Sequence, residues 1–130
     1  MSLRRTIGRA LISAAAIQTA VVPILADWNE THVFSDQWSP HARFHGVVSL
    51  GMNATLAPVA LWMVWRRRSE PGPAALISIA YWGWFFGAAL VSGTDVEDPG
   101  HPVPRVAGIP ANMVAATVGV SLAVLGWCLD

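Results

Sequence analysis

The sequence has few charged residues, no lysine and a single cysteine. Charged residues make up 12% of the 130 residues and the formal net charge is zero, whereas soluble domains carry about a quarter charged residues. Without an excess of positive charge, a nucleic-acid-binding surface is excluded, because nothing would meet the phosphates. The lone cysteine, Cys128, has no partner for an internal disulfide. A chain this poor in charge and 54% hydrophobic is typical of a membrane protein.

Long uncharged stretches predict the fold. Each is close to the roughly 20 residues that cross the hydrocarbon core of a bilayer as a helix. We therefore expect an all-α fold, a four-helix bundle integral to the membrane, with a single domain over residues 1–130. The two outer loops are expected at residues 27–42 and 94–106. The predicted spans cover residues 7–26, 43–65, 74–93 and 107–128.

The arginines predict the orientation of these spans. One group precedes the first span and a second group separates the second span from the third; the members are Arg4, Arg5, Arg9, Arg66, Arg67 and Arg68. By the positive-inside rule both groups, and both chain termini, are expected in the cytoplasm. All four histidines then fall on the outer side. The arginine-only, alanine-rich composition favours a multi-pass protein of the bacterial inner (plasma) membrane.

Small residues recur at intervals of four within the predicted spans. Gly83 and Gly87 form one such pair, and Ala115 and Gly119 form another. In lipid this spacing lets helix backbones approach closely. It predicts tight packing, either among the four helices or between copies in a homo-oligomer.

Polar and aromatic residues gather around the first outer loop. Asp27, Trp28, Asn29 and His32 open this loop, and Trp38 comes near its end. Such a concentration of ionisable groups beside a membrane span favours a functional site, since these groups are costly there.

A polar stripe is expected on the second span. His41, His45, Ser49 and Asn53 follow one another every four residues, a spacing that places neighbours on the same face of a helix. We expect this stripe to descend into the bundle, where Gln18, Tyr81 and Asn112 from the other spans would meet Asn53.

Our first hypothesis is a membrane-embedded enzyme that performs acid–base chemistry on a lipophilic small molecule, without a cofactor. Isomerisation, cyclisation or epoxide opening would fit, since each needs a positioned acid and base. Asp27 and His45 are the expected acid–base pair, His41 and His32 would orient or relay, and Arg43 would neutralise a developing anion. The expected substrate-binding residues are Asn29, Asn53, Trp28, Trp38 and Asn112.

Other interpretations of the same residues remain open. His32, His41 and His45 could bind a metal ion or haem in a protein that is not an enzyme, because two histidines four residues apart form half of a metal site. The histidines and Arg43 could also cap the loop and contact lipid phosphates. The intramembrane amides could simply join helices. A small transport or assembly partner is a further alternative.

The block Asp27-Trp28-Asn29-x-Thr31-His32, followed by Trp38-x-Pro40-His41-Ala42-Arg43-Phe44-His45, resembles a family of small uncharacterised four-span membrane proteins from bacteria and fungi. The resemblance implies that these residues form one site, without naming an activity. The expected architecture is also similar to that of the sterol isomerase and sigma-2 receptor group, which handles lipophilic ligands with buried acids and histidines. That second similarity concerns the fold alone.

Overall fold

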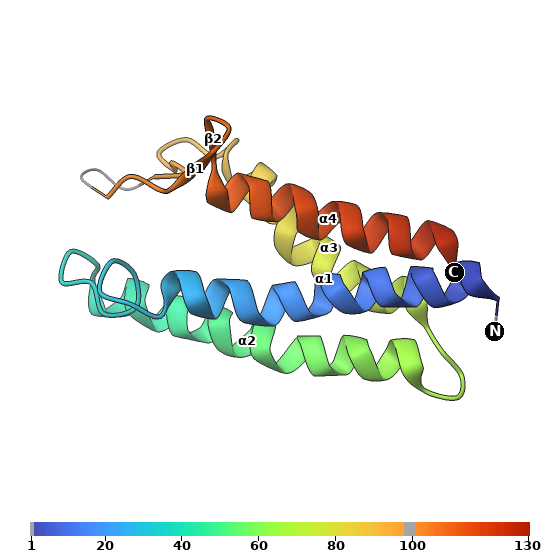
Figure 1. The fold of residues 1–130 in the computed structure, drawn as a ribbon. Coiled ribbons are helices and arrows are strands. Elements are labelled where there is room, and N and C mark those ends of the chain that lie inside the picture. Colours follow the sequence, from blue (N-terminus) through green and yellow to red (C-terminus); the bar gives the residue numbers. More distant parts are fainter. Residues whose placement is uncertain (1, 98–100) are drawn as a thin grey trace.

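The computed structural model describes residues 2–97 and 101–130, which form a helical bundle with one small hairpin (Figure 1). The hairpin pairs two short antiparallel strands. The prediction of an all-α fold is confirmed in this coarse form, and α1, α2 and α4 are each long and apolar enough to cross a membrane. The elements are α1 (Leu3–Asp27), α2 (Pro40–Trp65), α3 (Pro71–Ala88), β1 (Arg105–Val106), β2 (Ile109–Pro110) and α4 (Ala111–Leu129).

The helices begin where the sequence offers caps or prolines. Ser39 caps α2, its hydroxyl accepting a hydrogen bond from the Ala42 N–H, and Pro40 follows in the first turn, where its missing N–H costs nothing. Helix α3 likewise starts at a proline, Pro71, and ends at Ala88. It therefore begins before residue 74 and ends before residue 93, the expected bounds of the third span. It is not among the three helices that are long and apolar enough to cross a membrane.

The hairpin before α4 was not anticipated. Ala107 and Gly108 have φ angles of 51° and 82°, and two consecutive positive φ values match the two-residue turn that suits the twist of β-hairpins. Arg105 donates to the Gly108 carbonyl at 2.9 Å and pairs with Glu97. Residues 107–110 therefore belong to the hairpin rather than to the fourth span. Residues 98–100 of the expected loop 94–106 lie outside the described residues.

Helix α1 is the centre of the bundle. It contacts α2, α3 and α4, and α3 also contacts α2 and α4; Figure 1 shows α1 running between α2 and α4. The core consists mostly of alanines with a few larger residues, which lets the helices pack closely. Large apolar side chains point outward instead, as they do in a protein surrounded by lipid; examples are Leu25, Trp62, Trp84 and Leu125.

Glycines permit two close contacts in this core. A Cβ atom on Gly8 would lie 2.7 Å from the Gly126 carbonyl oxygen, and a Cβ on Gly126 would lie 2.7 Å from that of Gly8. The crossing of α1 and α4 therefore depends on both glycines. Gly119 faces the indole of Trp82, with no room for a side chain between them. At Gly83, in contrast, an added Cβ would meet nothing within 4 Å.

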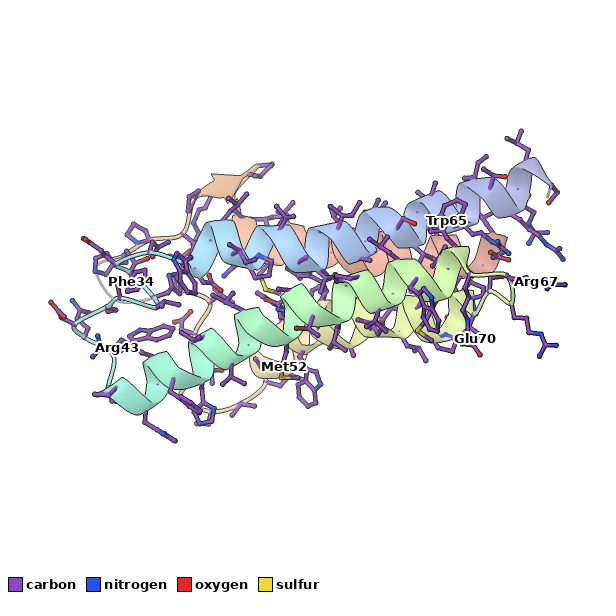
Figure 2. All side chains as sticks on the ribbon, turned by 90° about the horizontal axis from the view of Figure 1, so that it is seen from below. Phe34, Arg43, Met52, Trp65, Arg67 and Glu70 are labelled. Atoms are coloured by element: carbon purple, nitrogen blue, oxygen red, sulfur yellow. The ribbon has the colours of Figure 1, made fainter. Side chains whose placement is uncertain are left out.

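The bundle has two chemically distinct ends. We call the end with both chain termini and the α2–α3 connection the terminal end, and the end with residues 28–39, 89–97 and 101–110 the loop end (Figure 1). Figure 2 shows Trp65, Arg67 and Glu70 at the terminal end, and Phe34 and Arg43 at the loop end.

An arginine ties the terminal end together. The Arg9 guanidinium contacts the Asp130 carboxylate at 2.8 Å and donates to the Ser69 hydroxyl at 2.7 Å. These bonds join the start of α1, the α2–α3 connection and the end of α4. Arg4 adds a hydrogen bond of 2.9 Å to the Cys128 carbonyl.

Candidate functional site

An acid and a histidine meet at the loop end. Asp27 is the last residue of α1, and its Oδ1 lies 3.8 Å from the Nε2 of His32, with the two side chains 37% and 35% exposed. The chain after α1 turns back on itself, because the backbone N–H groups of Asn29 and Val33 both donate to the Asp27 carbonyl. This turn brings His32 to the end of the helix.

Asn29 organises the turn that carries His32. Its Oδ1 accepts from the Thr31 backbone N–H at 2.9 Å and from the Thr31 hydroxyl at 2.7 Å, while its Nδ2 donates to the Ala26 carbonyl at 2.6 Å. This arrangement is a turn in which an asparagine side chain replaces a backbone contact. These bonds use both ends of the amide to hold the loop in this turn.

The same bonds favour one tautomer of the neutral His32 ring. Thr31 Oγ1 lies 2.9 Å from His32 Nδ1, and its hydroxyl donates to Asn29 Oδ1 in the shorter contact. With that donor used, the hydroxyl oxygen accepts a hydrogen bond from Nδ1–H. In the neutral ring the Nε2 atom facing Asp27 therefore has a free lone pair, which is the form that can act as a base.

Asn53 brings an unpaired amide into the bundle. Its side chain is 5% exposed, and Nδ2 has no hydrogen-bond partner among the described residues. The other buried atom of this kind is Arg66 Nε, whose guanidinium already pairs with Glu70. Tyr81 on α3 has the Asn53 side chain and the Asp27 charge as polar neighbours. A buried donor without an acceptor is costly and calls for an explanation.

The prediction that the polar residues of α2 form one continuous face is wrong. His41, His45 and Ser49 are exposed, whereas Asn53 is buried with Leu50. Four residues turn an α-helix by about 40° more than one full revolution. Over the three steps from His41 to Asn53 the direction therefore changes by about 120°, a third of a turn.

His45 does not join Asp27 as its acid–base partner. Its Nε2 lies 3.1 Å from the Nε2 of His41, and the two rings stand edge to face with centroids 4.6 Å apart. The histidine that reaches Asp27 is His32. The sequence predicts relay for His32 and catalysis for His45, whereas the contacts place His32 and not His45 next to Asp27.

The two tryptophans of the first loop differ in position. Trp38 packs its edge against the His32 ring, at a centroid distance of 5.5 Å, and is half-buried. Trp28 is 53% exposed and contacts Phe34 at 5.6 Å. Trp38 thus lies beside His32, whereas Trp28 lies on the outer surface.

The remaining expected site residues have other contacts. Asn112 donates to the Val96 carbonyl at 2.9 Å and holds the second loop against the start of α4. Gln18 donates to the Ala115 carbonyl at 2.7 Å and joins α1 to α4, so neither amide pairs with Asn53. Arg43 is half-buried near the start of α2, at the loop end (Figure 2).

The three histidines proposed as metal ligands are not brought together. His32 contacts Asp27, Thr31 and Trp38, while His41 and His45 contact each other. Within residues 2–97 and 101–130, no group of three or more His, Cys, Asp or Glu side chains is arranged to hold a metal ion.

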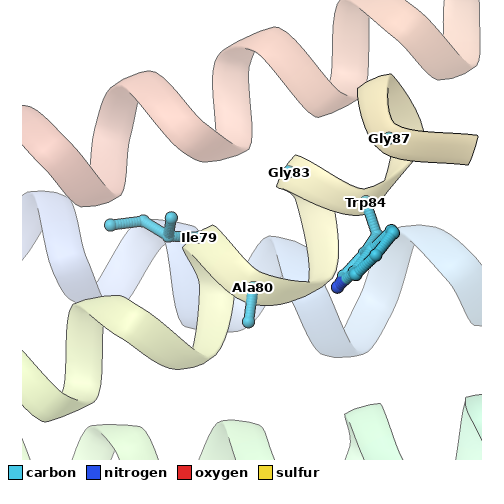
Figure 3. Close-up of a pocket in the computed structure, with 5 residues that line it drawn as sticks. All are labelled: Ile79, Ala80, Gly83, Trp84 and Gly87. Carbon is cyan, nitrogen blue, oxygen red and sulfur yellow. The ribbon is translucent and has the colours of Figure 1, made fainter. Parts of the chain in front are cut away.

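Two open hollows lie away from this cluster. One is an apolar groove on the outward face of α3 (Figure 3), lined by Ile79, Ala80, Gly83, Trp84 and Gly87. The other is a polar cleft where His101 of the second loop meets the first loop; its other residues are Glu30, Phe34, Ser35, Asp36 and Gln37. Neither hollow includes Asp27, His32 or Asn53.

A helical bundle with an apolar exterior, an alanine-rich core and three helices able to cross a membrane has the architecture of a small membrane protein. The chain belongs to the family of unknown function DUF6640, whose family model matches residues 11–130. No curated protein and no solved structure matches the chain significantly. Membership of a family without a known activity agrees with the expectation from the sequence, but no link to the sterol isomerase and sigma-2 receptor group accompanies it.

Proposed function

We propose that this protein is a four-span membrane enzyme that performs acid–base chemistry on a lipophilic small molecule at the loop end of its bundle. The proposal rests on the Asp27–His32 pair, 3.8 Å apart, together with the buried Asn53 amide, whose Nδ2 lacks an acceptor among the described residues. Tyr81 is a polar neighbour of both Asn53 and Asp27. Isomerisation, cyclisation or epoxide opening would need these elements and no oxidant or cofactor.

The position of the termini supports four crossings. Both termini lie at one end of the bundle (Figure 1), and the bond from Arg9 to Asp130 joins their helices there. An odd number of crossings would separate the termini, so α3 would cross as well. Its 18 residues span about 27 Å, close to the hydrocarbon thickness of about 30 Å. With the arginines inside, the loop end faces outward from a bacterial plasma membrane.

The Asp27–His32 pair suits proton transfer. In the tautomer that the Thr31 contact favours, His32 Nε2 has a free lone pair and can accept a proton. The separation of 3.8 Å exceeds a hydrogen bond, and leaves both groups free to contact a third atom. One member would remove a proton from the substrate while the other delivers a proton elsewhere on it.

The Asn53 amide suits the polar end of a lipophilic ligand. A carbonyl, hydroxyl or epoxide oxygen would supply the acceptor that Nδ2 lacks, and the hydrocarbon part would lie between helices or against lipid. Tyr81 and Trp38 would flank that oxygen and His32, respectively. Donors of this kind stabilise negative charge that develops on oxygen during a reaction.

Native mass spectrometry of the protein in mild detergent tests this proposal. We expect the wild type to retain a lipophilic small molecule other than a phospholipid, and Asn53→Ala to lose it. His101→Gln is the matched control, since His101 lies in the cleft between the loops, and it should retain the molecule.

Turnover then separates binding from catalysis. With the retained compound as substrate, Asp27→Asn and His32→Gln should bind it but lower kcat by at least about 100-fold, the usual contribution of a general acid or base. Absence of any such molecule from the wild type, or full activity in both variants, would overturn the proposal.

A further inference from the structure

The paired histidines on the exposed face of α2 have no part in the proposed reaction. His41 and His45 lie one helical turn apart, and their Nε2 atoms converge to 3.1 Å. From this convergence we propose that they form a binding site for a single divalent transition-metal ion, Cu²⁺ before Zn²⁺, with water in the remaining coordination positions.

The distance between the two nitrogen atoms fits a shared metal ion. With metal–nitrogen bonds of about 2.0–2.1 Å, a separation of 3.1 Å corresponds to an angle at the metal of roughly 95–100°. That angle suits two adjacent positions of a square-planar or octahedral ion, and is narrower than the tetrahedral angle that Zn²⁺ prefers. Imidazole pairs also bind Cu²⁺ most tightly among the divalent ions of this series.

The helix holds the two rings in place. Ser39 and Pro40 fix the start of α2 just before His41, and the ring of Phe44 lies beside both imidazoles, at centroid distances of 6.3 and 5.6 Å. Because these contacts already hold both rings, the entropic cost of ordering them around a metal ion is small. Both histidines are exposed, so a hydrated metal ion can reach them.

The charges around the pair do not prevent binding. Arg43 is the nearest cation in sequence, but its position on α2 is about 160° around the helix from either histidine, on the half-buried side. The positive helix N-terminus weakens the affinity without blocking the site. Binding requires both neutral rings to carry their proton on Nδ1, since a ligating imidazole must have a free lone pair on Nε2.

Titration with CuSO₄ tests the site, using full-length protein in detergent without a polyhistidine tag and a chromophoric chelator as competitor. We expect about one Cu²⁺ per chain, with affinity reduced at least about tenfold in His41→Gln and in His45→Gln. His101→Gln should bind as the wild type does. Zn²⁺ should bind more weakly than Cu²⁺.

A spectroscopic measurement keeps the test specific. Electron paramagnetic resonance of the bound Cu²⁺ should report two nitrogen ligands in the wild type, and fewer in either single variant. Equal Cu²⁺ affinity in the wild type and the double variant His41→Gln/His45→Gln would overturn the proposal. A site lost only in His101→Gln would do the same.

Discussion

At the terminal end Arg9 reaches Asp130 at 2.8 Å and Ser69 at 2.7 Å, whereas at the loop end His32 stays 3.8 Å from Asp27 and Asn53 Nδ2 has no partner. The terminal end uses its polar groups to join segments of the chain. The loop end holds Asp27 and His32 apart in a half-buried position, and the nearby Asn53 amide is buried without an acceptor among the described residues. Groups that stabilise a fold are paired closely, so the difference separates a structural cluster from a candidate functional one.

The largest effect should come from the crossing of α1 and α4 at the terminal end. Gly126→Ala places a Cβ 2.7 Å from the Gly8 carbonyl oxygen, and we expect this overpacking to lower the free energy of unfolding by about 1–3 kcal/mol. Gly51→Ala on α2 is the matched control, because an added Cβ meets nothing within 4 Å there. Unfolding in mixed micelles compares the two; equal stabilities would show that the crossing is not tight.

Removing one charge from each end gives a smaller effect and compares the ends directly. Arg9→Gln leaves the Asp130 side chain, 8% exposed, without its cation, and should cost about 1–2 kcal/mol. His32→Gln breaks a longer and more exposed contact and should cost under about 1 kcal/mol. The same unfolding assay applies. A larger loss from His32→Gln would mean that the loop-end pair is structural after all.

The smallest effect is expected at Asn53, one of two amides inside the bundle, with Gln18 as its comparison. Gln18→Ala removes a hydrogen bond of 2.7 Å to the Ala115 carbonyl and should cost about 1 kcal/mol. Asn53→Ala removes a donor that is already unpaired, so its cost should be near zero. If both variants lose the same stability, then the Asn53 amide makes a stabilising contact in the folded bundle and is not free to bind a ligand.

Hydropathy and charge predicted the helical fold well, because long apolar stretches have few alternatives to a helix in lipid. The hairpin at residues 105–110 escaped notice. Its turn places Ala107 at φ 51°, a conformation for which alanine gives no signal in the sequence. The only hint was Gly108, which favours such turns.

The sequence predicted the region of the candidate site but not which residues contact each other within it. Asp27 ends α1 and His32 lies five residues later in the loop, and the turn made by Asn29 and Thr31 brings them together. The pattern asparagine, any residue, threonine hinted at this turn. Spacing alone favoured His45, because residues four apart on a helix lie close to one face. The small rotation at each step adds up over several steps and moves distant residues to another face.

The hydrogen bonds of α1 have a consequence for biosynthesis. This helix is made before α4, yet Gln18 and Arg9 bond to Ala115 of α4 and to Asp130 just beyond it. Thr19 can bond to the Ala15 carbonyl within α1, and to Ser78 and Trp82 once α3 has been made. During synthesis the bonds of Gln18 and of Arg9 to Asp130 are therefore the ones that wait for α4. A nascent chain stopped before α4 would keep these two side chains without the partners that they have in the folded bundle.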